Sequence, residues 1–359
     1  MQKQSKYRLL VVRLGAMGDI LHALPAVTAL RNAHPAWVID WVVEPMWSAL
    51  LTAQPGIARD TPAAFPRQPI VDRVCFASTR KWRHNLFARE TRDEIGALRR
   101  ELKQAHYDAV IDFQGAVRSA LIGRMARSRR YIGEASPREA LAKILFTERI
   151  ATRGVHVIEQ DLEVAAAVAG DELKATQPKL PFDSDAEKWA DQLMTDGGDA
   201  PAVLINPGAG WGAKRWPVER YADVARGLLN RGCRVFVNAG PGEVLLADEV
   251  VKRTGGGAIS LLCSIEQLIA ITRRVSLAIA GDTGPLHLAC ALGRPVVGIY
   301  GPTDPGRNGP FGTGFKVFRS PGSRRDHARR EEPEAGLLTI SPEEVLEAAE
   351  ELLYLEAAR

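Results

Sequence analysis

Short apolar runs alternate with longer amphipathic segments along the first half of the chain. Tyr7–Arg13 is rich in Leu and Val without a polar alternation, which is typical of a strand buried on both faces. A glycine-containing loop follows, and the segment from about Asp19 to Ala33 predicts a helix that stops before Pro35. Val38–Val43 and Asp108–Phe113 predict further strands. Strands that alternate with helices indicate βαβ units and a parallel sheet.

The second half of the chain repeats this alternation. The predicted strands are Ala202–Ile205, Arg234–Asn238, Ala258–Leu262, Leu277–Ala280 and Pro295–Tyr300. The predicted helices are Val218–Asn230, a segment after Pro241, a segment capped by Ser264, Pro285–Leu292 and a final one that opens at Ser341. The fold class that follows is α/β, with two doubly wound sheets in series.

Two stretches without apolar periodicity divide the chain. The proline-containing Gln177–Leu180 is typical of a domain boundary. We therefore expect one domain over residues 1–176, a second over 177–335 and a C-terminal helix over 336–359 that packs back on the first domain. Ser320–Glu334 is charged and poor in apolar residues, so we expect a mobile loop there. Ligands of doubly wound sheets bind beyond the carboxyl ends of the strands, here across a cleft between facing domains.

Composition narrows the class of protein. With 46% hydrophobic and 25% charged residues, the 359-residue chain is typical of a soluble globular protein of two domains. No apolar run is long enough to span a bilayer and the polar N-terminus lacks a signal-peptide core, so we expect a cytoplasmic location. The four cysteines are scattered, which predicts neither disulfides nor a zinc site. We expect no bound metal.

Gly15-Ala16-Met17-Gly18-Asp19 lies between the first predicted strand and its helix. The glycines allow a tight turn and a close approach of the backbone to a ligand. A carboxylate at this end of the sheet can act as a general base, but Asp is also a common helix N-cap. Spacing alone leaves both interpretations open. The GxGxxG spacing of dinucleotide-binding proteins is absent.

Two further glycine-containing loops occupy the same place after a strand. In Asn206–Pro217, backbone N–H groups, a helix start and the cations Lys214 and Arg215 suit a phosphate group. An ordinary turn with two solvated cations is the alternative. In Gly281–His287, the Gly284 backbone and the Thr283 hydroxyl can hold a second phosphate.

Three acidic or imidazole side chains near these loops have two interpretations each. Asp282 suits a phosphate site only if its carboxylate is turned away or caps the helix. His287 is either a donor contact or a structural histidine. Glu243 follows a strand and a turn, where an acid can accept hydrogen bonds from ribose hydroxyls, although a solvated helix residue is equally compatible.

Cations are enriched in the first half of the chain, although the net charge is only +4. Arg80, Lys81 and Arg83 lie within four residues, and Arg138 follows later. Guanidinium groups match carboxylate and phosphate oxygens, so an anionic small molecule or an acidic membrane surface is expected as a partner. Nucleic acid is not, because no basic helix interleaved with aromatics occurs.

Six motifs, in a constant order, cover nearly the whole chain. They are Arg13–His22, Trp41–Glu44, Asp112–Gly115, Pro207–Pro217, Gly281–His287 and Tyr300–Pro305. Together they resemble the lipopolysaccharide heptosyltransferases of glycosyltransferase family 9. The first motif and the Thr303-Asp304-Pro305 ending are most similar to heptosyltransferase I.

The resemblance implies a GT-B fold of two Rossmann-like domains that face a central cleft, the acceptor in the first and the nucleotide-sugar donor in the second. It implies inverting, metal-independent transfer of L-glycero-D-manno-heptose from ADP-heptose, a substrate, to Kdo of Kdo-lipid A, without a cofactor. An enzyme of this kind works at the cytoplasmic face of the inner membrane as a peripheral protein.

The resemblance also implies roles for individual residues. Asp19 matches the catalytic base, and Lys214 matches a lysine that neutralises donor phosphate. The donor-binding matches are Gly18, Lys214, Arg215, Glu243, Asp282, Thr283, Gly284 and His287. The acceptor-binding matches are Arg80, Lys81, Arg83 and Arg138, where the correspondence is loose.

Other functions share these features. A transferase for a later heptose or for a protein hydroxyl differs only in its acceptor. A nucleotide-sugar epimerase of similar fold acts on the donor alone, and a binding protein on this scaffold has no turnover. The residues do not separate ADP from UDP, nor do they determine the oligomeric state.

Overall fold

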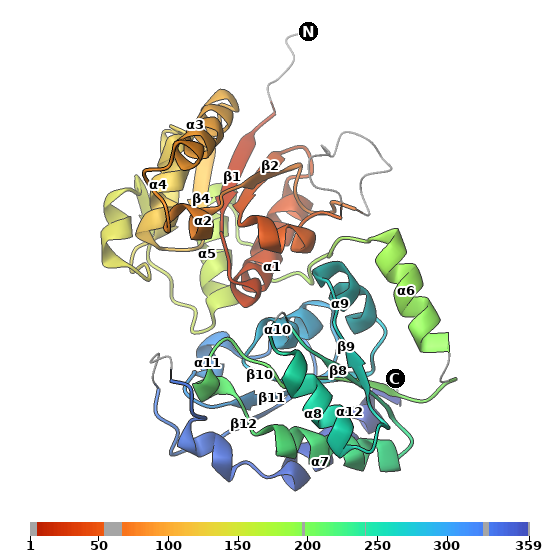
Figure 1. Ribbon diagram of the computed structural model, residues 1–359. Coiled ribbons are helices and arrows are strands. Elements are labelled where there is room, and N and C mark those ends of the chain that lie inside the picture. Colours follow the sequence, from red (N-terminus) through yellow and green to blue (C-terminus); the bar gives the residue numbers. More distant parts are fainter. Residues whose placement is uncertain (1–5, 54–66, 196–197, 241, 326–329, 358–359) are drawn as a thin grey trace. The chain divides into compact units, whose positions relative to one another are not determined.

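The computed structural model describes residues 6–53, 67–195, 198–240, 242–325 and 330–357 (Figure 1). The chain divides into two compact units, Met1–Phe182 and Asp183–Arg359. The boundary therefore follows Phe182 instead of Thr176. The reason is local: the Asp183 carboxylate accepts a hydrogen bond from the Ala186 N–H at 2.9 Å and so caps the first helix of the second unit.

The first unit contains a six-stranded parallel sheet in the order β3-β2-β1-β4-β5-β6. Its strands are β1 (Arg8–Val12), β2 (Val38–Val43), β3 (Arg73–Phe76), β4 (Ala109–Asp112), β5 (Arg130–Glu134) and β6 (Glu148–Ile150). Its α-helices are α1 (Met17–Ala33), α2 (Thr79–Trp82), α3 (Arg89–Gln104), α4 (Val117–Met125) and α5 (Val157–Ala169), and its 3₁₀ helices are η1 (Pro45–Leu50) and η3 (Ala140–Ile144). The strand order reverses between β1 and β4, which makes this point the ligand-binding position of a doubly wound sheet.

Helices cover both faces of the first sheet, as Figure 1 shows. Leu10 and Val12 of β1 point to the face covered by α3, α4 and η3, and pack with Leu98 and Ala120 of those helices. Leu9 and Val11 alternate with them and point to the opposite face. Because β1 is apolar on both faces, it is buried at the centre of the sheet.

The second unit repeats the architecture, with a parallel sheet in the order β12-β11-β10-β7-β8-β9. Its strands are β7 (Ala202–Asn206), β8 (Arg234–Asn238), β9 (Ile259–Leu261), β10 (Leu277–Gly281), β11 (Val296–Tyr300) and β12 (Phe315–Arg319). Its α-helices are α6 (Ser184–Thr195), α7 (Val218–Asn230), α8 (Val244–Arg253), α9 (Ile265–Thr272), α10 (Gly284–Ala291), α11 (Pro305–Asn308) and α12 (Pro342–Ala357), and its 3₁₀ helices are η4 (Gly212–Lys214) and η5 (Ala335–Thr339). Here the order reverses between β7 and β10.

The last helix belongs to the second unit. We expected residues 336–359 to pack back on the first domain, but Val345, Ala349 and Leu352 of α12 lie in the core formed with α7 and the second sheet. Lys316 of β12 adds an ion pair with Glu351 at 2.8 Å. The apolar face of α12 is buried in this core, which explains why the helix packs on the second unit.

The central elements match the sequence predictions, as does β9 at one edge of the second sheet, but four strands at or near the other edges do not. β2, β8 and α7 have the bounds that the apolar pattern predicted. β3, β5, β6 and β12 were not predicted. Phe315–Arg319 shows why, since its charged and half-buried residues lack the continuous apolar run of a central strand.

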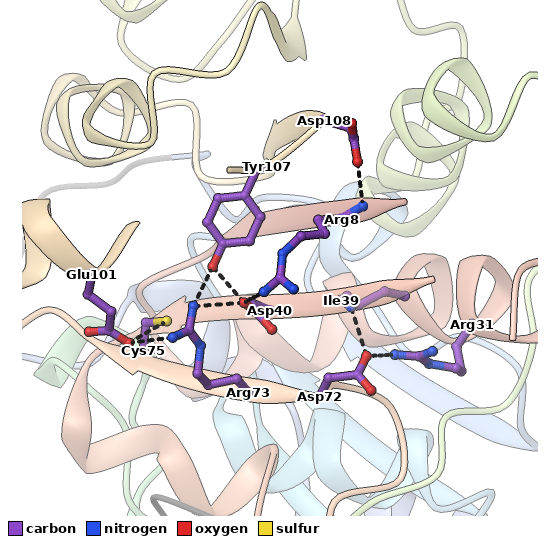
Figure 2. Close-up of polar contacts among 10 residues, drawn as sticks. All are labelled: Arg8, Arg31, Ile39, Asp40, Asp72, Arg73, Cys75, Glu101, Tyr107 and Asp108. Carbon is purple, nitrogen blue, oxygen red and sulfur yellow. Dashed lines mark hydrogen bonds and ion pairs between the residues drawn. The ribbon is translucent and has the colours of Figure 1, made fainter. Parts of the chain in front are cut away.

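A buried polar cluster links β1, β2 and β3 near their amino-terminal ends (Figure 2). The Asp40 side chain is 1% exposed. Its Oδ2 accepts hydrogen bonds from Tyr107 Oη at 2.6 Å and from Arg73 Nη2 at 2.9 Å, with Arg8 Nη2 at 3.7 Å. Burial, followed by the nearby acidic groups, raises the pKa of Tyr107. The cluster lies away from the carboxyl ends of the strands, so its role is to hold the sheet together.

Candidate functional site

The loop after β1 places Asp19 in the first turn of α1. Its Oδ2 accepts a hydrogen bond from the Ala16 N–H at 3.0 Å, and its Oδ1 lies 3.2 Å from Arg13 Nη2. Ala16, not Asp19, is the N-cap residue, and the Asp19 carboxylate bonds back to it from the third helical position. The Asp19 side chain stays 39% exposed. The carboxylate is thus oriented by two contacts and remains accessible to a substrate.

Arg13 fixes this loop through hydrogen bonds to two backbone carbonyl groups. It is buried at the end of β1, where its Nη1 donates to the Phe113 carbonyl and its Nε donates to the Asp19 carbonyl at 3.2 Å. Trp41 Nε1 donates to the Arg13 carbonyl at 3.0 Å. A charged residue that ends an apolar run was the available signal in the sequence, but we assigned Arg13 no individual role.

The Asp112–Gly115 motif shapes the neighbouring loop, after β4. Asp112 Oδ1 accepts the N–H groups of Gln114 and Gly115, each at 2.8 Å. Burial raises the pKa of Asp112 against the effect of these hydrogen bonds. Gln114 Oε1 in turn accepts the Leu14 N–H at 3.0 Å. Gln114 therefore ties the β4 loop to the β1 loop at the reversal of strand order.

The predicted acceptor-binding cations have different surroundings in the structure. The Arg138 side chain is exposed, and its backbone N lies where a Cβ on Gly115 would meet it at 3.0 Å, so Arg138 is close to the β4 loop. Gly115 has a φ of +61°, which glycine adopts without strain.

Arg80 lies near the β1 loop. Its guanidinium is 5.9 Å from the ring centre of Trp47, and a Cβ on Gly15 would lie 2.8 Å from Trp47 Nε1. The buried Glu44 accepts the Arg80 N–H at 3.0 Å and so orients the start of α2.

Lys81 and Arg83 are placed differently. Lys81 Nζ contacts Glu90 Oε1 and Glu94 Oε1 of α3, each at 2.7 Å. Arg83 is exposed and its Nε lies 3.3 Å from His84 Nε2. The charge of Lys81 is therefore compensated within the first unit, which makes it a weaker candidate than Arg80 or Arg138.

In the second unit, Lys214 of η4 meets Asp282, which directly follows β10. Lys214 Nζ is ion-paired with Asp282 Oδ2 and lies 3.3 Å from the Asp282 carbonyl oxygen and 4.4 Å from the ring centre of Trp211. His287 Nε2 lies 3.1 Å from Asp282 Oδ1. Burial raises the pKa of Asp282, but the His287 hydrogen bond and the Lys214 charge outweigh it, so the pKa lies below its ordinary value.

The Asp282 carboxylate points toward Lys214 and His287, which is one of the two arrangements that a phosphate site at this loop requires. Thr283 is the N-cap of α10, and its hydroxyl donates to the Gly281 carbonyl at 3.2 Å. Glycine permits the close packing of the two loops, because a Cβ on Gly281 would lie 3.2 Å from the Lys214 carbonyl oxygen. Lys214 and the start of α10 thus form one cluster at the reversal of strand order.

Glu243 and Arg215 lie beside this cluster, after β8 and β7. Arg215 Nη2 is 4.0 Å from Glu243 Oε1, and Arg215 Nε is 3.4 Å from the Ala209 carbonyl. A Cβ on Gly208 would lie 2.0 Å from Glu243 Oε2, so the Glu243 carboxylate packs directly against the Gly208 backbone. The Asn206 and Asn238 amides, which the sequence did not single out, join the ends of β7 and β8 at 2.8 Å.

Part of the charged stretch Ser320–Glu334 is bonded to the Lys214 loop. The Ala213 N–H donates to the Arg330 carbonyl at 3.0 Å, and the Glu334 N–H donates to the Ala213 carbonyl at 3.2 Å. At these residues the stretch is a fixed support for η4, unlike the mobile loop that we expected. Residues 326–329 lie outside the described residues.

Neither a metal-binding cluster nor a membrane-spanning helix occurs in the parts of the chain that the structure describes. No group of three or more His, Cys, Asp or Glu side chains there is arranged to hold a metal ion. No helix there is long and apolar enough to cross a membrane.

Known proteins are similar to this chain in sequence and in fold. The sequence profile of glycosyltransferase family 9 (heptosyltransferase) matches residues 95–337. Lipopolysaccharide heptosyltransferase 1 of Escherichia coli K12 is 30% identical over 318 residues, which cover 88% of this chain and 94% of that protein.

Solved structures of the E. coli heptosyltransferase WaaC are similar throughout. The structure with ADP has a TM-score of 0.77 at 29% identity and covers 96% of this chain and 99% of its own. The structure with ADP-2-deoxy-2-fluoro heptose has a TM-score of 0.71 at 29% identity, with 89% and 95% covered. The expectation of two doubly wound GT-B domains is confirmed by the two parallel sheets and these neighbours.

Proposed function

Since this chain belongs to the heptosyltransferases of glycosyltransferase family 9, we propose that it transfers L-glycero-D-manno-heptose from ADP-heptose to Kdo of Kdo-lipid A. Heptose transfer in the lipopolysaccharide core follows from the family and from its heptosyltransferase 1 relatives. The Kdo acceptor, inversion at the anomeric carbon and independence of metal are the finer parts of the proposal.

The observation that carries the mechanism is the Asp19 carboxylate, oriented by Arg13 and Ala16 and still accessible. In the proposed reaction it removes the proton from the acceptor hydroxyl, whose oxygen forms a bond to the anomeric carbon. The bond from that carbon to the diphosphate oxygen breaks, and ADP leaves with the electron pair. Attack opposite the leaving group inverts the configuration.

The second unit supplies the proposed donor site. The leaving diphosphate gains negative charge, which preorganised cations and N–H groups stabilise. Lys214 is held by Asp282, so its ammonium is in place before the donor binds. Arg215, Thr283 and Gly284 extend the proposed anion site, and Glu243 is available for ribose hydroxyls. Gly18, which lies in the first unit, is a further proposed donor contact.

In the proposed reaction, these cations and helix N-termini take the place of Mg²⁺ in balancing the diphosphate charge. We therefore expect full activity in EDTA. Activity that is lost in EDTA and restored by Mg²⁺ or Mn²⁺ would contradict this part of the proposal.

Arg80, Arg83 and Arg138 are the proposed contacts for the acceptor, with Lys81 in a secondary role. Kdo carries a carboxylate and lipid A carries phosphates, so the acceptor is strongly acidic. It is also anchored in a lipid leaflet, so we propose that the protein works as a peripheral protein on the cytoplasmic face of the inner membrane.

The deciding experiment incubates the purified protein with ADP-heptose and deacylated Kdo-lipid A and measures the product by mass. One added heptose supports the proposal. Product only with an acceptor that already carries a heptose would make it a transferase for a later step. Donor conversion without acceptor would indicate an epimerase, and donor binding without any turnover a binding protein.

A further inference from the structure

Two apolar side chains stand exposed on η3 of the first unit. Leu141 and Ile144 are each 68% exposed. They are three residues apart in a 3₁₀ helix, in which side chains at i and i+3 eclipse, so both lie on the same side. Leu121 is exposed as well; it belongs to α4, a helix that contacts η3. Contiguous exposed apolar side chains on a soluble domain mark an interaction surface.

Exposed cations lie on the same two helices as these apolar side chains. Arg118 and Arg124 lie one turn before and after Leu121 on α4, and both are exposed. Lys143 is exposed between Leu141 and Ile144. Residues 117–149, all of them described, hold eight Lys and Arg against three Asp and Glu, and Glu148 is already paired with Arg130 at 2.8 Å.

This surface lies next to the sheet edge where the strands of the first unit end and where its candidate site residues lie. Residues 137 and 138, just before η3, lie against Gly115 at the carboxyl end of β4. α4 begins at the same edge, two residues after Gly115. A flat partner that covers α4 and η3 therefore reaches the edge where Arg138 and the loop of Asp19 lie.

We propose that this α4–η3 surface docks the first unit on an anionic lipid bilayer. It consists of Leu121, Leu141 and Ile144 with Arg118, Arg124 and Lys143. Apolar tips that enter the headgroup boundary, ringed by cations that meet anionic lipids, have the chemistry of an interfacial membrane site. A protein partner of ordinary composition offers no such excess of negative charge. The inference deepens the proposed function, because an acceptor anchored in lipid requires the enzyme at that surface.

The test measures binding of the full chain to vesicles by co-sedimentation, without donor or acceptor. One vesicle consists of equal parts phosphatidylglycerol and phosphatidylethanolamine, and the other of phosphatidylcholine alone. The apolar variant is Leu141→Ser with Ile144→Ser. Its control is Tyr354→Ser with Leu355→Ser, which removes two exposed apolar side chains of α12 in the second unit. The charge variant is Arg124→Gln with Lys143→Gln.

The wild-type protein and the α12 control should bind anionic vesicles equally and bind phosphatidylcholine more weakly. The apolar variant should bind at least about tenfold more weakly, because two side chains no longer enter the apolar layer. The charge variant should bind roughly 25-fold more weakly, from about 1 kcal/mol for each cation near an anionic surface. The four changed positions are exposed, so the thermal midpoints should match that of the wild type.

Wild-type affinity in either variant would overturn the proposal, as would a wild-type protein that ignores anionic vesicles. A wild-type dimer that the apolar variant converts to a monomer would reassign the surface to a contact between copies. Turnover on deacylated acceptor is measured separately, and both variants should retain it. Its absence in the wild type would refute the proposed function, while the vesicle result would stand by itself.

Discussion

The two sheets have the same strand order and place a carboxylate and a cation at the same topological point, but the two pairs differ in which side chains are buried. In the first unit the cation, Arg13, is buried and the Asp19 carboxylate is accessible. In the second unit both members are largely buried: the Asp282 side chain is 8% exposed and the Lys214 side chain 12%, with the Lys214 ammonium beside the Trp211 ring.

This difference separates two roles for the same kind of pair. A carboxylate that exchanges a proton with a substrate must be accessible to that substrate. A buried arginine can orient such a carboxylate without covering it. A carboxylate that fixes a cation needs no access to substrate, and burial strengthens its hold. The reversal of strand order positions both pairs, but only the first pair keeps an accessible member, Asp19, whereas both side chains of the second pair are largely buried.

Replacing Asp19 with Asn gives the sharpest test of this contrast. The amide keeps an acceptor for the Ala16 N–H but cannot take a proton. Turnover should therefore fall by about 10²–10⁴-fold, the usual effect of losing a general base, while the thermal midpoint changes little. Turnover near the wild-type value would show that Asp19 only stabilises the start of α1.

The cation of the second pair should affect the chemical step as well as binding. In the proposed mechanism, Lys214→Ala removes a group that meets growing charge on the leaving diphosphate, so kcat should fall by about 10²-fold. Steady-state kinetics with varied donor separates kcat from KM. A rise in donor KM with an unchanged kcat would mean that Lys214 contributes equally to ground state and transition state.

The acceptor-side cations should differ according to their partners. Arg138 is exposed beside the β4 loop, whereas the charge of Lys81 is met by Glu90 and Glu94. Arg138→Ala should raise the acceptor KM by about tenfold or more if a charged hydrogen bond is lost. Lys81→Ala is the matched control and should change it little. Equal effects of the two variants would remove this distinction.

The smallest effect concerns pH. The lowered pKa of Asp282 means that the folded protein keeps this carboxylate ionised where the unfolded chain, with an ordinary value of about 3.9, takes up a proton. Stability from Asp282 is thus complete above about pH 4 and is lost as pH falls further, by at most about 1.4 kcal/mol per pH unit.

Urea unfolding of the wild type and of Asp282→Asn between about pH 5 and pH 3 measures this contribution. The difference in unfolding free energy should shrink toward the acid end. A difference that stays constant over that range would show that the pKa of Asp282 is not lowered.

The local pattern of the chain determined its central elements and the places of its candidate residues. Mostly apolar runs predicted β2 and β8, and the sequence also predicted α7 at about its observed bounds. Strand-to-helix loops with glycine pointed to Asp19, Lys214 and the start of α10, because parallel strands expose their loops at one edge. These features depend on residues that are close in the sequence.

Only the tertiary structure decided which of these residues meet. Asp282 and Lys214 are 68 positions apart, and their pairing depends on β10 lying beside β7. Arg13 gains its role from the Phe113 carbonyl, 100 positions away on the loop of a neighbouring strand. Edge strands such as β12 and the placement of α12 also follow from packing partners. Local patterns record what a segment can bury, whereas partner choice depends on the geometry of the assembled sheet.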